Sequence, residues 1–149
     1  MKIIFLFFLF ISFSAHSEDK ICSTQKLDIL QKIESDLISC KIDMPENPST
    51  ADMNNATYNA TDCLMALAHR IFEEYYTQDK IQVTEDFDRF VKEIHINSHN
   101  LIQRSDAAKN FYNGTMYNTM AINDAYLTIK NVVQQYIKQI KEECRYIYK

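Results

Sequence analysis

The sequence predicts an all-α fold: a short-chain, up-up-down-down four-helix bundle with two long crossover loops, stapled by disulfides. Apolar residues recur at helical spacing in four stretches, four cysteines are present, and the 149 residues include one glycine and two prolines. A β-sandwich or barrel needs a turn every ~8–12 residues, and those turns use Gly, Pro and Asn-Gly pairs. Loops that bind nucleotide phosphates need several glycines close together. The composition excludes both, and the net charge of −4 argues against a nucleic-acid partner.

Residues 1–17 have the pattern of a secretory signal peptide. The basic Lys2 precedes an apolar stretch from Ile3 to Ile11, and Ala15-His16-Ser17 forms an Ala-x-Ser cleavage site. A transmembrane anchor would need ~18 or more apolar residues. We therefore expect cleavage after Ser17 and one mature domain, residues 18–149, that is secreted, extracellular and not inserted in a membrane.

Four stretches of the mature domain have the spacing of amphipathic helices. Thr61 and Thr84 are the expected N-caps of the second and third helices, because acidic residues follow each of them in the first turn. The last helix keeps one apolar face along its whole length. The expected helices are Thr24–Cys40, Thr61–Tyr75, Thr84–Ile102 and Ile122–Cys144.

The connections between these helices indicate the directions in which they run. The first, from Met44 to Asn59, is polar and contains both prolines, and the third, from Ser105 to Asn118, contains the single glycine. The middle link, Gln78-Asp79-Lys80, is short and requires an antiparallel pair. A long crossover can run the length of a bundle and join parallel helices, so the two long connections favour the up-up-down-down arrangement.

The four cysteines allow three pairings, and their even number in an exported chain indicates disulfides. In an up-up-down-down bundle, Cys22 before the first helix and Cys144 near the end of the last lie at the same end, which favours Cys22–Cys144. Cys40–Cys63 would then staple the first crossover. A free-thiol or zinc role is disfavoured because no Cys-x-x-Cys spacing occurs, and we expect no metal site.

Three N-glycosylation sequons begin at Asn55, Asn59 and Asn113. All three fall in the two segments that are expected to be loops. Their placement agrees with secretion, and we expect a glycoprotein.

The best catalytic candidate is the pair His95 and His99, four residues apart on the third expected helix. That spacing places two imidazoles on one face, as zinc sites require. Ile96, however, stands where a zincin has its general-base glutamate. We therefore interpret the pair as exposed polar residues on the outer face of the helix.

No other group of residues predicts a catalytic site. His69 on the second helix lacks a nucleophile or carboxylate constellation and is interpreted as a half-buried histidine. The adjacent pairs Glu73-Glu74 and Glu142-Glu143 point in different directions around their helices, which is typical of solvated faces. We expect neither enzyme activity nor a cofactor.

Four segments of the mature chain carry a resemblance: Asp19-Lys20-Ile21-Cys22 with the helix that follows, Asn54-Asn55-Ala56-Thr57, Cys63-Leu64-Met65-Ala66-Leu67 and Lys138-Gln139-Ile140-Lys141-Glu142-Glu143-Cys144. They resemble interleukin-4 and its interleukin-13 relatives. The resemblance covers nearly the whole mature chain in order, length and cysteine framework. It implies an immune cytokine that signals through a heterodimeric type I cytokine receptor, with the first and last cysteines paired. The chain lacks two further cysteines of mammalian interleukin-4, whose partners correspond to Cys40 and Cys63, and this leaves those two to bond to each other.

The resemblance also implies receptor-binding residues. In that family one receptor chain contacts helices A and C, and a second contacts helices A and D. The acidic residue of helix A corresponds to Asp28, six residues after the first cysteine. The basic residue of helix C corresponds to His99, so a histidine stands in place of that family's permanent charge. The aromatic residue of helix D has no match, since Lys141 stands at that position. We expect the protein to be a monomer.

Three alternatives stay open at this point. One is another short-chain cytokine, of the interleukin-2, interleukin-15 and interleukin-21 group. A second is a secreted, cysteine-stapled helical inhibitor, similar to the plant invertase and pectin-methylesterase inhibitors, for which a Cys22–Cys40 bond would argue. The third is a carrier of a hydrophobic ligand with a hollow apolar interior.

Overall fold

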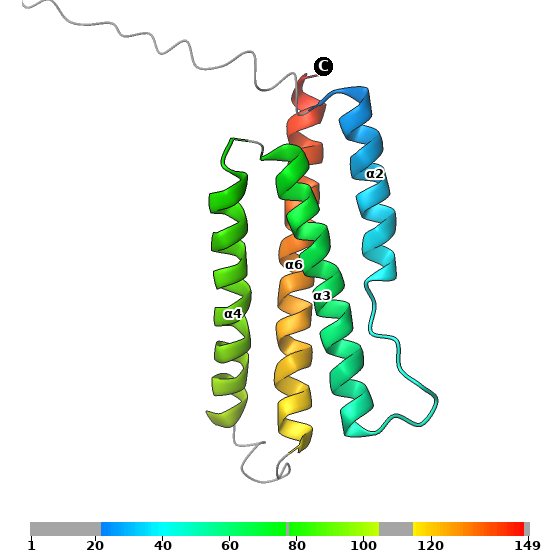
Figure 1. Ribbon diagram of the computed structural model, residues 1–149, viewed down its shortest axis with the longest axis vertical. Helices are drawn as coiled ribbons and strands as arrows, with labels where there is room; N and C mark the ends of the chain where they lie inside the picture. The colour runs from blue at the N-terminus through cyan, green and yellow to red at the C-terminus, as the bar shows by residue number, and fades with distance from the viewer. Residues whose placement is uncertain (1–21, 77, 105–114, 148–149) are drawn as a thin grey trace, which may run out of the picture.

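The computed structural model describes residues 22–76, 78–104 and 115–147, and all of its regular structure there is helical. The expected all-α class with four helices is confirmed (Figure 1). The residues 1–21, which include the expected signal peptide, lie outside the described part, as does the segment 105–114 with Asn113 and Gly114. The helices are α2 (Thr24–Ser39), α3 (Thr50–Tyr75), α4 (Lys80–Arg104) and α6 (Thr115–Ile147).

Each helix runs opposite to the one before it, so the expected up-up-down-down arrangement is wrong. Lys26 near the start of α2 contacts Glu74 near the end of α3, and Cys40 after α2 bonds to Cys63 in the middle of α3. The same reversal holds for α4 and α6, where Ser98 near the end of one binds Asp124 near the start of the other. The colours in Figure 1 follow this alternation down α2, up α3, down α4 and up α6.

The reversal follows from where α3 begins. The helix starts at Thr50, so the segment expected to be a polar crossover supplies its first turns, and the chain turns back on itself between residues 40 and 49. Ser49 and Asp52 form a capping box: the Ser49 hydroxyl accepts from the Asp52 N–H at 3.2 Å, and the Asp52 carboxylate accepts from the Ser49 N–H at 2.9 Å. These bonds satisfy N–H groups that a helix start otherwise leaves unpaired.

The expected N-caps of two helices are therefore inside helices. Thr61 is buried in the middle of α3, where its hydroxyl donates to the Thr57 carbonyl at 2.9 Å. Thr84 lies within α4, which begins four residues earlier at Lys80. A threonine followed by acidic residues can be an N-cap, but the same pattern can also lie in an inner turn of a helix that has already begun. Both positions were misassigned for this reason.

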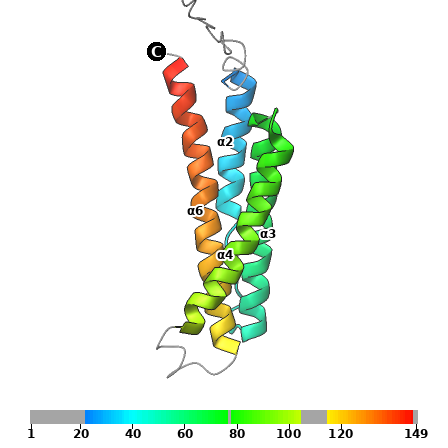
Figure 2. The ribbon, with the colours of Figure 1, turned by 90° about the vertical axis from the view of Figure 1, so that its left-hand side faces the viewer.

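The helices α3 and α6 lie between α2 on one side and α4 on the other, as the two perpendicular views show (Figures 1 and 2). They run parallel, since Thr119 near the start of α6 donates to Asn54 near the start of α3 at 2.7 Å. The buried face of α6 includes Ile129 and Val133, both fully buried. No helix among the described residues is long and apolar enough to cross a bilayer.

Candidate functional site

Both disulfides have the predicted pairing. Cys22 bonds to Cys144 with a Cα–Cα distance of 5.2 Å, and Cys40 bonds to Cys63 with a Cα–Cα distance of 5.4 Å. Cys22 precedes α2 and Cys40 is its C-cap, so the two bonds hold the two ends of the same helix. The first bond ties α2 to α6 and the second ties it to α3. This structure does not contain the Cys22–Cys40 bond that would argue for an inhibitor of the plant type.

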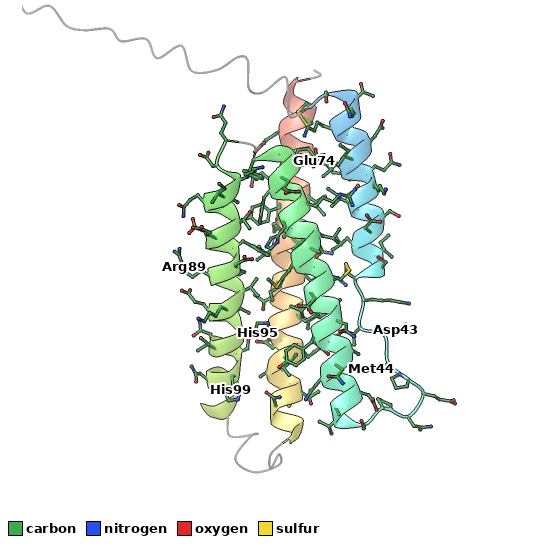
Figure 3. The ribbon with its side chains drawn as sticks, in the orientation of Figure 1. Asp43, Met44, Glu74, Arg89, His95 and His99 are labelled. Carbon is green, nitrogen blue, oxygen red and sulfur yellow. A yellow bond between two sulfur atoms is a disulfide. The ribbon has the colours of Figure 1, made fainter. Side chains whose placement is uncertain are left out.

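Polar contacts at the Cys22 end join α2 to α3. The Lys26 ammonium binds the Glu74 carboxylate at 2.7 Å and lies 5.5 Å from the centre of the Tyr75 ring. The Tyr75 hydroxyl donates to the Lys26 carbonyl. Burial, followed by the negative charge of Glu74, raises the pKa of Tyr75 to about 12. Glu74 is therefore part of an interhelical contact, and the interpretation of Glu73-Glu74 as a solvated pair is wrong for this residue (Figure 3).

The two residues that the resemblance assigned to receptor binding lie at opposite ends of the bundle. Asp28 is exposed near the start of α2. His99 lies near the end of α4, as Figure 3 shows. Because α2 and α4 both run antiparallel to α3, the start of one and the end of the other are far apart along the bundle axis. The structure does not bring Asp28 and His99 into one site.

His95 and His99 line a groove between α4, α3 and α6, so their expected position on the outer face is wrong. Both side chains are half-buried, and the His95 ring lies 6.5 Å from the Tyr58 ring of α3. Burial lowers the pKa of His95. The groove has a volume of about 320 Å³ and is also lined by residues of α6. In the described ranges, no three His, Cys, Asp or Glu side chains converge as metal ligands would.

His69 has a carboxylate partner that the sequence did not reveal. Its Nε2 atom lies 2.7 Å from an oxygen of Asp88 on α4, so the pair links α3 to α4 on the bundle surface. The two residues are 19 positions apart, and only the antiparallel packing of the helices brings them together. The remaining acidic pair has local partners: Glu142 binds Lys138 at 3.8 Å, and Glu143 accepts from the Gln139 amide at 2.9 Å.

Two of the sequons lie on a helix, so their expected position in a loop is wrong. Asn55 and Asn59 are exposed and one turn apart on the same side of α3. The threonines of these sequons point the other way. Thr57 and Thr61 are 1% and 2% exposed, and each hydroxyl donates to the carbonyl four residues earlier, at 2.8 and 2.9 Å. The third sequon, at Asn113, lies outside the described residues.

Sequence reasoning missed an apolar groove between α4 and α6, which we call the α4–α6 groove. Its volume is about 410 Å³, within the usual range of ligand pockets. Phe87 is buried at its floor, and the other apolar residues are half-exposed. Val83 precedes the expected start of the third helix at Thr84, although its helical spacing from Phe87 and Phe90 could have included it. Val132 stands one turn before Tyr136 on the last expected helix. The groove is lined by Val83, Asp86, Phe87, Phe90, Val132 and Tyr136.

These features define a helical bundle held by two disulfides, with half-open grooves and paired charges on its surface. No protein-family model matches the chain, and neither does any curated protein or solved structure. The function is therefore argued from the bundle itself.

Proposed function

We propose that this chain is an exported protein ligand that acts by binding another protein, and that its partner is a receptor chain of the type I cytokine class. The observation that carries the proposal is the disulfide framework, in which Cys22 before the first helix bonds to Cys144 near the end of the last. The resemblance to the interleukin-4 and interleukin-13 family implies this bond. Two disulfides and the absence of a membrane-spanning helix among the described residues are also compatible with an extracellular protein.

The surface of α2 supplies the first candidate contact. Asp28 is exposed and, within the described part of the chain, takes part in none of the ion pairs that join the helices, so its charge is presented to solvent. The neighbouring acids of this helix, Glu34 and Asp36, are paired with Lys141 of α6 and Arg70 of α3, and these pairs hold the helix in place. A charge on a rigid helix increases the association rate and the specificity of a complex with a basic partner.

A binding screen against purified type I cytokine receptor ectodomains tests this function. We expect one chain to bind, and we expect Asp28→Lys to weaken that binding by about tenfold or more. Asp62→Lys is the matched control, since Asp62 is exposed on α3 and undergoes the same charge change. Absence of binding to every ectodomain would overturn the receptor proposal, and equal effects of the two substitutions would remove Asp28 from it.

The alternating helix directions favour a second candidate. Helical cytokines run up-up-down-down, whereas up-down-up-down bundles with short loops serve other roles. A secreted helical enzyme inhibitor is the alternative, although its disulfides differ from those of the plant type. Inhibition of a secreted enzyme by the purified protein, with no binding to receptor ectodomains, would establish this second function in place of the first.

A further inference from the structure

We propose that the α4–α6 groove binds a short segment of a protein partner that presents apolar side chains flanked by lysine or arginine. The inference rests on the proposed function, because it gives the protein ligand a second contact surface in addition to α2. It follows from the apolar floor of the groove and from the distribution of charge around it.

The floor of the groove provides an unfilled apolar surface. Val83, Phe87 and Phe90 occupy one side of α4 over two helical turns, about 10 Å. Val132 and Tyr136 face them from α6, and the Tyr136 ring packs at 6.4 Å from the Phe87 ring. Exposed clefts with aromatic walls are typical of protein–protein contacts, where a partner's apolar side chain fills the cleft.

One acidic residue lines this groove, and others follow it along the two helices. Asp86 lines the groove, and Glu93 lies seven residues later, on the same side of α4. On α6, Glu143 lies seven residues after Tyr136. Burial raises the pKa of Tyr76 beside the groove, and the negative charge of Glu143 raises it further. Asp124 faces α4 further along the same seam, since it accepts from Ser98 at 2.7 Å.

Two lysines of α6 lie on its α2 side, and a third, Lys138, pairs with Glu142 of the same helix. Lys141 pairs with Glu34 of α2, and Lys130 lies 5.7 Å from the ring of Tyr126, whose hydroxyl binds the Cys40 carbonyl beside α2. None of the residues that line the groove is a lysine or an arginine. Arg89 of α4 binds Asp86 at 3.3 Å, with both side chains more than half exposed.

The acidic residues near the α4–α6 groove indicate which kind of partner binds there. A second copy of the chain would bring the same acidic rim against itself, and an anionic lipid surface would be repelled in the same way. A segment with apolar side chains flanked by cations would cover the apolar residues of the groove, and its cations would pair with the acidic side chains at the rim of the groove. The partner that fits is therefore a basic, amphipathic protein segment.

The test uses the full mature protein and two synthetic amphipathic helical peptides. One peptide is built from leucine and lysine, and the other has glutamate in place of each lysine. We expect the Leu/Lys peptide to bind saturably and to shift the amide NMR signals of the groove residues. The Leu/Glu peptide should not bind.

Three variants separate groove binding from general attraction to an acidic protein. Asp86→Lys/Glu93→Lys reverses the rim, and Val132→Asn makes the floor polar. Each should weaken binding of the Leu/Lys peptide by about tenfold or more. The double variant Asp62→Lys/Glu73→Lys makes the same charge change on the exposed side of α3 and should leave the affinity unchanged.

Three outcomes would each overturn the groove proposal. They are amide shifts confined to other faces of the protein, an equal loss of affinity in the rim and control variants, and full binding of the Leu/Lys peptide by Val132→Asn. The receptor screen has a separate readout. Groove binding without any receptor hit would leave this inference standing and remove the cytokine function. A receptor hit with no peptide binding would do the opposite.

Discussion

Tyr75 and Lys26 connect the last turn of α3 to the first turn of α2. The Tyr75 side chain is 6% exposed, and its hydroxyl donates to the Lys26 carbonyl. The ammonium of Lys26 binds Glu74 and lies near the Tyr75 ring. Each of these three residues contacts another, so removal of the Tyr75 hydroxyl should have a measurable effect on the stability of the protein.

We expect Tyr75→Phe to lower the free energy of unfolding by about 1 kcal/mol at pH 7, because the hydrogen bond from its hydroxyl to the Lys26 carbonyl is lost. The effect should also depend on pH. The pKa of Tyr75 is raised to about 12 from 10.0, so the stability from its neutral phenol is complete below pH 10 and is lost as the pH rises through 12. The Phe variant should therefore lose less stability than the wild type between pH 10 and pH 12.

Urea unfolding at a series of pH values measures both effects. Burial also raises the pKa of Tyr76 and of Tyr136, so part of the alkaline loss should remain in the variant. Tyr58→Phe is the control, since Tyr58 is 44% exposed. Identical alkaline losses in wild type and Tyr75→Phe would show that Tyr75 does not contribute to them.

At the scale of the element, the first ten residues of α3 determine how the bundle is connected. They depend on the capping box of Ser49 and Asp52, which pairs N–H groups at the start of the helix. The hydrogen bonds that Ser49 donates to the Asp52 carboxylate lower the pKa of Asp52 and favour its ionised form. We expect Ser49→Ala to cost about 1 kcal/mol and to increase amide exchange in Thr50–Asn59. Ser23→Ala, which removes the cap of α2, is the control and should act on that helix alone. Unchanged exchange in Thr50–Asn59 would contradict the role of the cap.

The start of α3 could not be predicted from apolar periodicity. The face that these turns bury is made of small or polar residues, Thr57, Ala60 and Thr61, rather than large apolar ones. The later stripe of Leu64, Leu67 and Ile71 was recognised because its residues are large. Once the helix start was misplaced, the first connection seemed long enough to cross the bundle, and the helix directions followed from that error.

The sequons of α3 lead to a prediction about the order of glycosylation and folding. An enzyme that recognises Asn-x-Thr must reach the threonine hydroxyl, but Thr57 and Thr61 are buried and bonded in the folded helix. We expect oligosaccharyltransferase to modify Asn55 and Asn59 in the reduced, unfolded chain and not in the folded protein. Mass spectrometry after treatment of both forms provides the measurement. Equal modification of the two forms would show that the folded helix opens readily at these turns.

At the scale of the whole molecule, the candidate surfaces depend on packing more than on sequence order. The sequence predicted both disulfides because the start of the first helix and the end of the last lie at the same end of a four-helix bundle in either arrangement, which selects one of the three possible pairings. It could not predict that Asp28 and His99 are separated, since this depends on the directions of α2 and α4. The contact of His69 with Asp88 needs the antiparallel pair that the short middle link predicted, together with a register that apolar spacing does not give. The apolar spacing on each helix could have identified the residues of the α4–α6 groove, but it could not show that the facing side chains leave a groove between the two helices.

The two disulfides and the packing of α2 predict how the molecule comes apart. Fully buried residues within α2 are Leu30 and Ile33, whereas α3 buries many more, and α3 and α6 form the centre of the bundle. Both disulfides end on the flanks of α2, so their removal should release this helix first. We expect hydrogen exchange of the reduced protein to be fastest in Thr24–Ser39, with α3, α4 and α6 still protected.

The separate contributions of the bonds should differ, because Cys22–Cys144 closes a separation of 122 residues and Cys40–Cys63 one of 23. On the chain-entropy model, replacement of the first pair by serine should cost about 5 kcal/mol and replacement of the second about 3 kcal/mol. Denaturant unfolding of the two double variants measures this order. A larger loss from the Cys40→Ser/Cys63→Ser variant would mean that the bond to α3 stabilises the native packing of α2 directly, beyond its restriction of the unfolded chain.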